Sequence, residues 1–224
     1  LINPIVGDEY IINRFISSLP FQITTAQKHV IEEISEDQKS SSRMLRLLQG
    51  DVGSGKTIVA LISLLRAVTS GKQAALLAPT ELLSKQHFQN ISQLLKCLDI
   101  QPALLIGSMS QKQKREVHEG LKSGKILLVI GTHALLTQEI EFINLGLAVV
   151  DEQHRFGVKQ RLVLGEKNGG CDVLIMTATP IPRTLAMTAY GDLKISQIDE
   201  KPAGRRDIKT ACLLYTSDAA DESD

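Results

Sequence analysis

Five short runs of apolar residues, each nearly continuous, recur along the chain at intervals that leave room for a helix. They are Met44–Leu48, Ala74–Ala78, Ile126–Ile130, Leu145–Val150 and Val173–Met176. A strand with one face in water alternates apolar and polar residues, whereas a strand buried on both faces of a parallel sheet is apolar throughout. The runs therefore predict a mainly parallel sheet covered on both sides, and Ala103–Ile106 is a weaker candidate for a further strand.

Segments with helical periodicity lie between these runs. Thr57–Val68 and Glu81–Leu98 each place apolar residues on one wide helical face, and the polar segment Ser110–Leu121 begins with a good capping residue. Alternation of strands and helices at this spacing is typical of an α/β fold. The segment Ser35–Arg43 is polar enough to predict an exposed loop.

A glycine-rich segment joins the first strand to the first of these helices. Gly50-Asp51-Val52-Gly53-Ser54-Gly55-Lys56-Thr57 has the pattern GxxxxGK[ST]. Backbone N–H groups of such a loop, together with the helix N-terminus, bind phosphate oxygens. Lys56 would contact the β- and γ-phosphates, and the Thr57 hydroxyl would hold Mg²⁺. The segment predicts a nucleotide site; the alternative is a glycine-rich turn with an exposed lysine.

An acidic pair follows the fourth apolar run. Asp151 and Glu152 come at its carboxyl end, which is where open α/β sheets place their chemistry. Asp151 would bind Mg²⁺, and Glu152 would orient and deprotonate an attacking water. The alternative is a solvated turn. The guanine-specifying pattern Asn-Lys-x-Asp is absent, which argues against a GTPase, and the adjacent acids argue against a small-molecule kinase.

Composition limits the class of protein further. The 224 residues carry 25 basic and 25 acidic side chains, so the formal net charge is zero, and aromatic residues make up 4% with no Trp. A surface that stacks bases on many rings is therefore not expected. The three cysteines are scattered, so no structural metal site is predicted. No apolar run is long enough to span a membrane, and no membrane partner is expected.

Further motifs appear in the order that superfamily 2 helicases have them. Asp151-Glu152-Gln153-His154 is a DExH-type box, and Thr177-Ala178-Thr179-Pro180 resembles the third helicase motif. Ala78–Leu83 with Gln86 and His87 resembles motif Ia, and Gly131–Leu136 resembles the next DNA-facing motif. Leu19-Pro20-Phe21 with Thr24 and Gln27 is similar to the Q element on the adenine side.

Three longer strings resemble the RecG family of bacterial ATP-dependent DNA helicases: Leu47–Thr57, Asp151–Val158 and Thr177–Leu185. The transcription-repair coupling factor shares most of them, but its box usually reads Asp-Glu-Glu-Gln, so Gln153-His154 favours RecG. The strings Gly191–Leu193 and Ile198–Pro202 favour RecG as well. The resemblance covers residues 15–211. It implies a RecA-like P-loop NTPase lobe, a three-layer sandwich, that uses ATP and Mg²⁺ and remodels branched DNA in repair and recombination.

The resemblance also implies roles for individual residues. Lys56, Asp151, Glu152 and His154 would be catalytic, and Gln27 would bind the adenine edge. Gln153, Thr177, Thr179 and Arg183 would couple the nucleotide state to DNA, and Thr80, Glu81, Thr132 and His133 would contact the DNA backbone. Four of these residues have an alternative interpretation without a role in function: Gln27 as a surface helix residue, Thr80 as a helix cap, His133 as a structural histidine, and Arg183 as a solvated charge.

The family pattern divides the chain into segments. Residues 1–24 would be a linker and the start of the Q element, 25–195 the ATP-binding lobe, and 196–211 a linker toward a second RecA-like lobe. Residues 212–224 resemble a translated sequencing adapter and are expected to be non-native; the alternative is a genuine divergent or disordered tail. They hold Asp218, Asp221, Glu222 and Asp224 and no basic residue, so without these four acids 25 basic residues face 21 acidic ones. The resulting charge of +4 suits a lobe that contacts DNA phosphates.

The RecG resemblance implies partners outside the chain. The family has a wedge domain that engages branched DNA and a second lobe that carries an arginine finger. We therefore expect a fragment that binds ATP but hydrolyses it poorly, from a protein of the bacterial cytoplasm associated with the nucleoid. Two alternatives stay open: the same lobe from a coupling factor that engages RNA polymerase, and a non-catalytic, nucleotide-dependent DNA-binding module.

Overall fold

The computed structural model describes residues 3–137, 139–151, 170–179 and 193–200. Its centre is a seven-stranded sheet with the order β3-β4-β2-β5-β6-β1-β7, in which every pairing is parallel. The strands are β1 Leu45–Gly50, β2 Gln73–Leu77, β3 Ala103–Leu105, β4 Leu128–Gly131, β5 Leu145–Asp151, β6 Asp172–Thr177 and β7 Lys194–Ile198. The predicted parallel sheet is confirmed.

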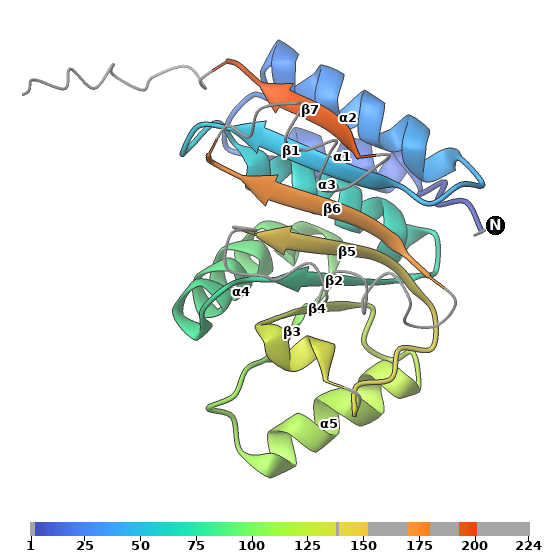
Figure 1. Ribbon diagram of the computed structural model, residues 1–224, viewed down its shortest axis with the longest axis vertical. Coiled ribbons are helices and arrows are strands. Elements are labelled where there is room, and N and C mark those ends of the chain that lie inside the picture. Colours follow the sequence, from blue (N-terminus) through green and yellow to red (C-terminus); the bar gives the residue numbers. More distant parts are fainter. Residues whose placement is uncertain (1–2, 138, 152–169, 180–192, 201–224) are drawn as a thin grey trace, which may run out of the picture.

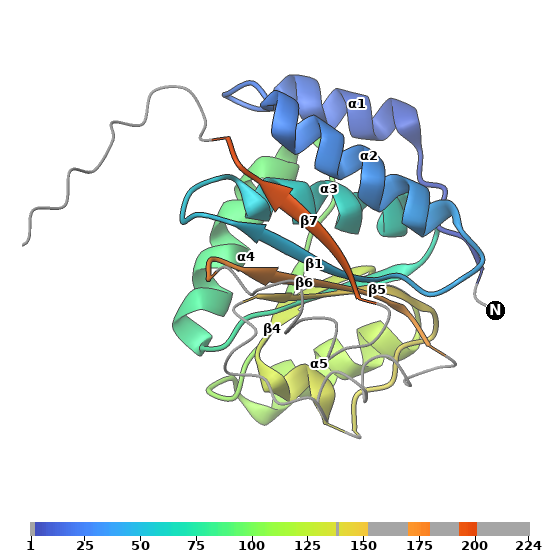
Figure 2. The same ribbon diagram turned by 45° about the horizontal axis from the view of Figure 1, so that its top comes forward.

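Helices cover both faces of the sheet (Figures 1 and 2). They are α1 Glu9–Ser18, α2 Thr25–Lys39, α3 Lys56–Thr69, α4 Glu81–Leu95 and α5 Gln111–Lys122, with short 3₁₀ turns at Lys96–Leu98 and His133–Leu136. The first four pack into one hydrophobic cluster, and α5 packs into a second cluster on the opposite face. The architecture is the predicted three-layer α/β sandwich.

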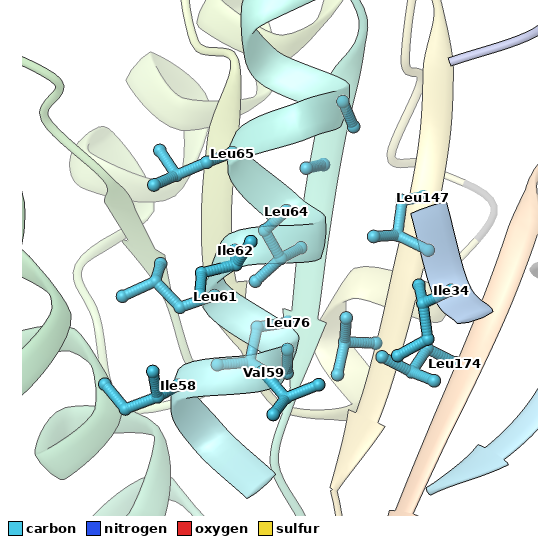
Figure 3. Close-up of a cluster of buried hydrophobic side chains, with 14 of the residues drawn as sticks. Ile34, Ile58, Val59, Leu61, Ile62, Leu64, Leu65, Leu76, Leu147 and Leu174 are labelled. Carbon is cyan, nitrogen blue, oxygen red and sulfur yellow. The ribbon is translucent and has the colours of Figure 1, made fainter. Parts of the chain in front are cut away.

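The inner strands are largely apolar because their successive side chains enter different hydrophobic clusters. Leu48, Leu76 and Leu174 pack with the first four helices, while Leu47 and Ile175 lie in the cluster with α5. Figure 3 shows α3 over the sheet, with its aliphatic side chains beside those of the strands. α3 contributes eleven buried residues, from Ile58 through Val68. Burial on both faces thus explains the sequence pattern from which the sheet was predicted.

Two predictions of local structure were wrong in part. The first half of the segment Ser35–Arg43 is not an exposed loop, because α2 continues to Lys39 and buries Ser35, Asp37 and Gln38, whereas residues 41–43 are exposed and non-helical as predicted. These polar side chains are tolerated in the interior where they have partners: Gln38 Nε2, for example, donates to the carbonyl of Ser63 at 3.1 Å. The strand predicted at Ile126–Ile130 begins instead at Leu128 and ends at Gly131.

Strand β7 was not predicted at all. Lys194–Ile198 has a mixed pattern of exposed and buried residues and, among the described strands, pairs with β1 alone at the edge of the sheet. An edge strand with polar residues lacks the continuous apolar run used to find the others. No helix among the described residues is long and apolar enough to cross a membrane.

Candidate active site

The glycine-rich segment forms a tight loop between β1 and α3. β1 ends at Gly50 and α3 begins at Lys56, as the motif requires. Gly53 and Gly55 have φ angles of 80° and 89°, in the left-handed region that favours glycine. A Cβ atom on Gly50 would lie 2.6 Å from Ser54 Oγ. The loop is therefore compact and needs glycine where the sequence has it.

Lys56 lies back across this loop. Its Nζ donates to the carbonyl oxygens of Gly50 at 2.5 Å and Asp51 at 2.9 Å. The buried Ser54 Oγ has no hydrogen-bond partner among the described residues. A cationic amine, an unsatisfied hydroxyl and a helix N-terminus in one loop are features that suit an anionic ligand with several oxygens. The arrangement fits the phosphates of a nucleotide.

Gln27 supports the phosphate loop from α2. Its side chain and that of Thr24 form a capping box, in which Gln27 Oε1 accepts from the Thr24 N–H at 3.0 Å. Gln27 Nε2 donates to the carbonyl of Ser54 at 2.7 Å, and the residue is 2% exposed. The surface alternative for Gln27 is therefore wrong. Both ends of the Gln27 amide are engaged in protein contacts. Its contact with adenine stays a prediction.

Asp151 is the last residue of β5 and contacts a histidine on α4. His87 Nε2 lies 2.8 Å from Asp151 Oδ2, and the two side chains are 13% and 15% exposed. The sequence motifs include His87 only as part of motif Ia and give it no role. The pairing brings together residues 64 positions apart, which sequence spacing does not reveal. His87 is therefore a candidate site residue found from the structure.

The third motif starts at the end of β6, between β1 and β5. Thr177 is paired in register with Gln49, and its neighbour Met176 with Asp151. The Oγ1 atoms of Thr177 and Thr179 lie 2.9 Å apart, and the Thr179 N–H donates to Thr177 Oγ1 at 3.2 Å. Residues Thr177–Thr179 thus form a small turn held by their hydroxyl groups. It lies at the same end of the sheet as Asp151 and the phosphate loop, where the parallel strands have their carboxyl ends.

The residues proposed to contact DNA lie at the ends of β2 and β4. Thr80 caps α4 by accepting from the Leu83 N–H at 3.2 Å, so the capping alternative is confirmed. Glu81 Oε1 accepts from the Ser108 N–H at 2.9 Å, and this hydrogen bonding lowers the pKa of the Glu81 carboxyl. Thr132 is 2% exposed and accepts from the Ala134 N–H at 3.4 Å. DNA contact by these side chains stays a prediction, as it does for His133, which begins the 3₁₀ turn.

Two hollows open beside the phosphate loop. One, of about 190 Å³, is lined by residues at the ends of β1 and β7, among them Gly50, Asp51, Gln197 and Asp199. The other, of about 720 Å³, runs between the Pro20–Phe21 segment and α4 and is lined by Thr57, His87 and Asn90. The larger hollow therefore connects the Q-type element, the end of the phosphate loop and the partner of Asp151.

Four predicted site residues, Glu152, Gln153, His154 and Arg183, lie outside the described residues, as do most of the proposed linker 196–211 and the tail 212–224. Among the residues that the structure describes, no group of three or more His, Cys, Asp or Glu side chains is arranged to hold a metal ion.

The sequence and fold match known helicases. A family model described as DEAD/DEAH box helicase matches residues 24–188. The ATP-dependent DNA helicase RecG of Streptococcus pneumoniae is 55% identical over 198 residues, which are 88% of this chain and 29% of that protein. RecG of Bacillus subtilis is 53% identical over 197 residues, again 88% of this chain and 29% of the relative. The chain thus spans less than a third of the length of these relatives.

Solved structures agree with this assignment. A structure of RecG bound to a three-way DNA junction has a TM-score of 0.81 and 43% identity, over 92% of this chain and 27% of that chain. The DEAD-box helicase Mss116 bound to ssRNA and UDP-BeF has a TM-score of 0.67 at 18% identity, over 88% of this chain and 44% of that chain, and so shows a common fold. The chain therefore belongs to the DEAD/DEAH box helicase family, with the RecA-like P-loop fold of its RecG members.

Proposed function

We propose that this chain is the ATP-binding lobe of an ATP-dependent DNA helicase that remodels branched DNA, such as stalled replication forks and recombination junctions. One observation carries the proposal: the Lys56 amine lies over a glycine-rich loop, held by the carbonyls of Gly50 and Asp51, at the sheet edge where β5 ends in Asp151. The RecG relatives and the RecG structure with a three-way junction support DNA as the partner.

ATP would bind with its phosphates in the loop Gly50–Thr57. Backbone N–H groups of the loop and the N-terminus of α3 would donate to phosphate oxygens. Lys56 would exchange its two carbonyl partners for the β- and γ-phosphates. The ammonium group binds these more strongly, because phosphates are anionic and carbonyls are neutral. Ser54 Oγ, which has no partner in the described structure, gains an acceptor in the same step.

Mg²⁺ fits the oxygen atoms present at this edge. A hydroxyl from Thr57 and a carboxylate from Asp151 are the hard ligands that Mg²⁺ prefers, and phosphates and waters complete its shell. When bound, the ion neutralises negative charge on the phosphates. Glu152, the residue after Asp151, would orient the attacking water and accept its proton, and His154 would act beside it.

Coupling of hydrolysis to DNA would involve the third motif. Thr177 and Thr179 form the turn at the end of β6, and Gln153 and Arg183 would respond with them to the nucleotide state. Thr80, Glu81 and His133 would provide the DNA-facing surface, and the buried Thr132 would shape it by binding the Ala134 N–H. Such contacts to the sugar–phosphate backbone fix position without reading sequence.

The proposed lobe, 25–195, would work with parts that the longer RecG relatives contain. A second RecA-like lobe would follow the linker 196–211, and a wedge domain would precede residues 1–24. An arginine finger raises hydrolysis by several powers of ten. We therefore expect the 224-residue polypeptide to bind ATP but to hydrolyse it poorly, and the full protein to act in the bacterial cytoplasm at the nucleoid.

Binding of a fluorescent ATP analogue with Mg²⁺, with and without Lys56→Ala, tests the proposal. The variant should bind at least tenfold more weakly, because it loses the charge aimed at the phosphates. Lys112→Ala is the matched control: Lys112 is exposed on α5, far along the chain from the loop, and its removal should leave affinity unchanged. Equal affinity of Lys56→Ala and the wild type would refute the phosphate site.

A further inference from the structure

Helix α4 connects two parts of the proposed machinery. Its N-cap residue Thr80 and its first residue Glu81 are proposed to face DNA, and its second turn carries His87, which contacts Asp151. Thr80 and His87 are about 10 Å apart along the helix axis at 1.5 Å per residue. Figure 1 shows α4 at the edge of the sheet toward which β2 and β5 point. One continuous helix therefore spans from the DNA-facing residues to the metal-binding carboxylate.

The contact between His87 and Asp151 fixes the carboxylate. His87 Nε2 lies 2.8 Å from Asp151 Oδ2, so the imidazole tautomer that carries a proton on Nε2 donates to this carboxylate oxygen. Both side chains are largely shielded from water, at 13% and 15% exposure, which strengthens the contact. Asp151 would hold the cation, directly or through a bound water, with its orientation set by this hydrogen bond. A group that hydrogen-bonds a ligand in this way sets its orientation and tunes metal affinity.

The first turn of α4 is tied to its surroundings. Thr80 Oγ1 caps the Leu83 N–H, and Ser84 Oγ, in a fully buried residue, donates to the Thr80 carbonyl at 3.0 Å. Glu81 binds the N–H of Ser108 in the loop after β3. These hydrogen bonds tie the start of α4 to its surroundings, so a shift of this turn on DNA binding would carry with it the helix that holds His87.

We propose that His87 is a positioning residue that orients Asp151 toward Mg²⁺ and transmits DNA contact at the start of α4 to the metal site. The inference deepens the proposed function and rests on it. The 720 Å³ hollow supports it, because Thr57, the other proposed Mg²⁺ ligand, lines the same space as His87, the hydrogen-bond partner of Asp151.

The test measures how strongly Mg²⁺ tightens binding of a non-hydrolysable ATP analogue to the 224-residue chain. In His87→Leu, which removes the donor, the Mg²⁺ concentration needed should rise about tenfold, within the range for loss of such a partner. Nucleotide affinity without Mg²⁺ should not change. His87→Gln, which keeps an N–H donor, should restore most of the effect. Asn90→Ala, on the same helix and hollow, is the control.

A double-mutant cycle separates positioning from a structural role. If His87 acts through the carboxylate, His87→Leu should have no further effect on Mg²⁺ dependence in an Asp151→Asn background. A branched DNA oligonucleotide should change the Mg²⁺ requirement of the wild type but not that of His87→Leu, since coupling between two sites needs a shared element.

The outcomes distinguish the two proposals. Tight, Mg²⁺-dependent binding by the wild type together with an unchanged Mg²⁺ requirement in His87→Leu overturns the role of His87 and leaves the ATP site standing. No nucleotide binding by the wild type overturns both. Circular dichroism checks folding. If His87→Leu unfolds, His87→Ala replaces it, and a folded His87→Ala variant with the same Mg²⁺ requirement as Asn90→Ala would overturn the role of His87.

Discussion

Gln27 Nε2 donates to the carbonyl of Ser54 at 2.7 Å, so a residue that caps α2 also supports the phosphate loop. The two roles use opposite ends of one amide, since Oε1 accepts from the Thr24 N–H. The position and shape of the loop therefore depend on a helix that starts 25 residues before the loop does. Changes to Gln27 should act on stability and on nucleotide binding together.

Gln27→Ala should lower the free energy of unfolding by about 1–3 kcal/mol, because it leaves the buried Ser54 carbonyl and the Thr24 N–H without these partners. ATP affinity should fall as well. Chemical denaturation and analogue binding measure the two effects. Gln22→Ala, an exposed glutamine before the same helix, should change neither. A Gln27→Ala protein as stable as wild type would show that the amide contributes nothing to the loop.

Gly55→Ala should damage the loop more than its backbone strain alone explains. A Cβ there would lie 2.1 Å from Gln27 Nε2, and φ is 89°. Gly71→Ala is a matched control, since φ is 77° but nothing lies within 4 Å of the added atom. Both should lose about 1–2 kcal/mol from the left-handed conformation. Only Gly55→Ala should lose ATP binding as well, and equal binding by the two variants would contradict the contact.

Asp37→Ala should destabilise the junction of α2, β1 and β7. Asp37 Oδ2 lies 2.8 Å from Arg46 Nη2, and Asp37 Oδ1 accepts from Lys194 Nζ at 2.6 Å. Arg46 is 6% exposed, so losing this partner leaves a buried charge with Glu33 as its remaining carboxylate. We expect a loss of about 3 kcal/mol in unfolding free energy.

Thermal and denaturant unfolding measure that loss. Glu36→Ala is the control, because Glu36 lies one residue away on the exposed face of α2. Since β7 has little apolar surface of its own, its pairing with β1 should weaken first, and hydrogen exchange should show the β7 amides losing protection before those of β5.

Asp172 should make stability depend on pH. Burial raises the pKa of this carboxyl to about 6, from an ordinary value of 3.8. The folded protein then keeps the proton at pH values where the unfolded chain has lost it. Stability should therefore fall as pH rises from about 4 to about 6 and stay level above, with a total change of about 3 kcal/mol.

Asp172→Asn should remove this slope. In the wild type, Asp172 Oδ1 accepts a hydrogen bond from the Met44 N–H at 2.8 Å. The oxygen of the asparagine amide can accept the same bond, and the amide carries no charge. Unfolding free energies measured at pH 4, 5, 6 and 7 compare the two proteins. If the variant retains the wild-type slope across this range, Asp172 is not the group responsible. Glu36→Gln, which changes an exposed carboxyl, should keep the slope.

The parts of the fold found from sequence are those where local pattern and final environment agree. Leu145–Val150 is apolar because both faces of β5 are covered, so the apolar run directly indicates a buried strand. The phosphate loop can be predicted for a similar reason, because its glycines are required by the backbone conformation of the loop itself. In both segments, the structural feature that requires these residue types is visible in the segment's own sequence.

The errors fall where the cause lies elsewhere in the fold. Asp37 and Gln38 are polar and look exposed, but Arg46, Lys194 and the Ser63 carbonyl bind them in the interior. Strand β7 exists because β1 offers it an edge, although its own residues are mixed.

The sequence by itself determined the α/β class, the sheet, the phosphate loop and the acid at the end of β5, since apolar continuity and glycine spacing are local properties of the chain. Only the tertiary structure decided that Gln27 supports the loop and that His87 meets Asp151. Both contacts join segments that are distant in sequence, and their geometry depends on how helices pack across the sheet. Hydrogen bonds form at specific distances and angles, which no residue pattern encodes until the elements are placed.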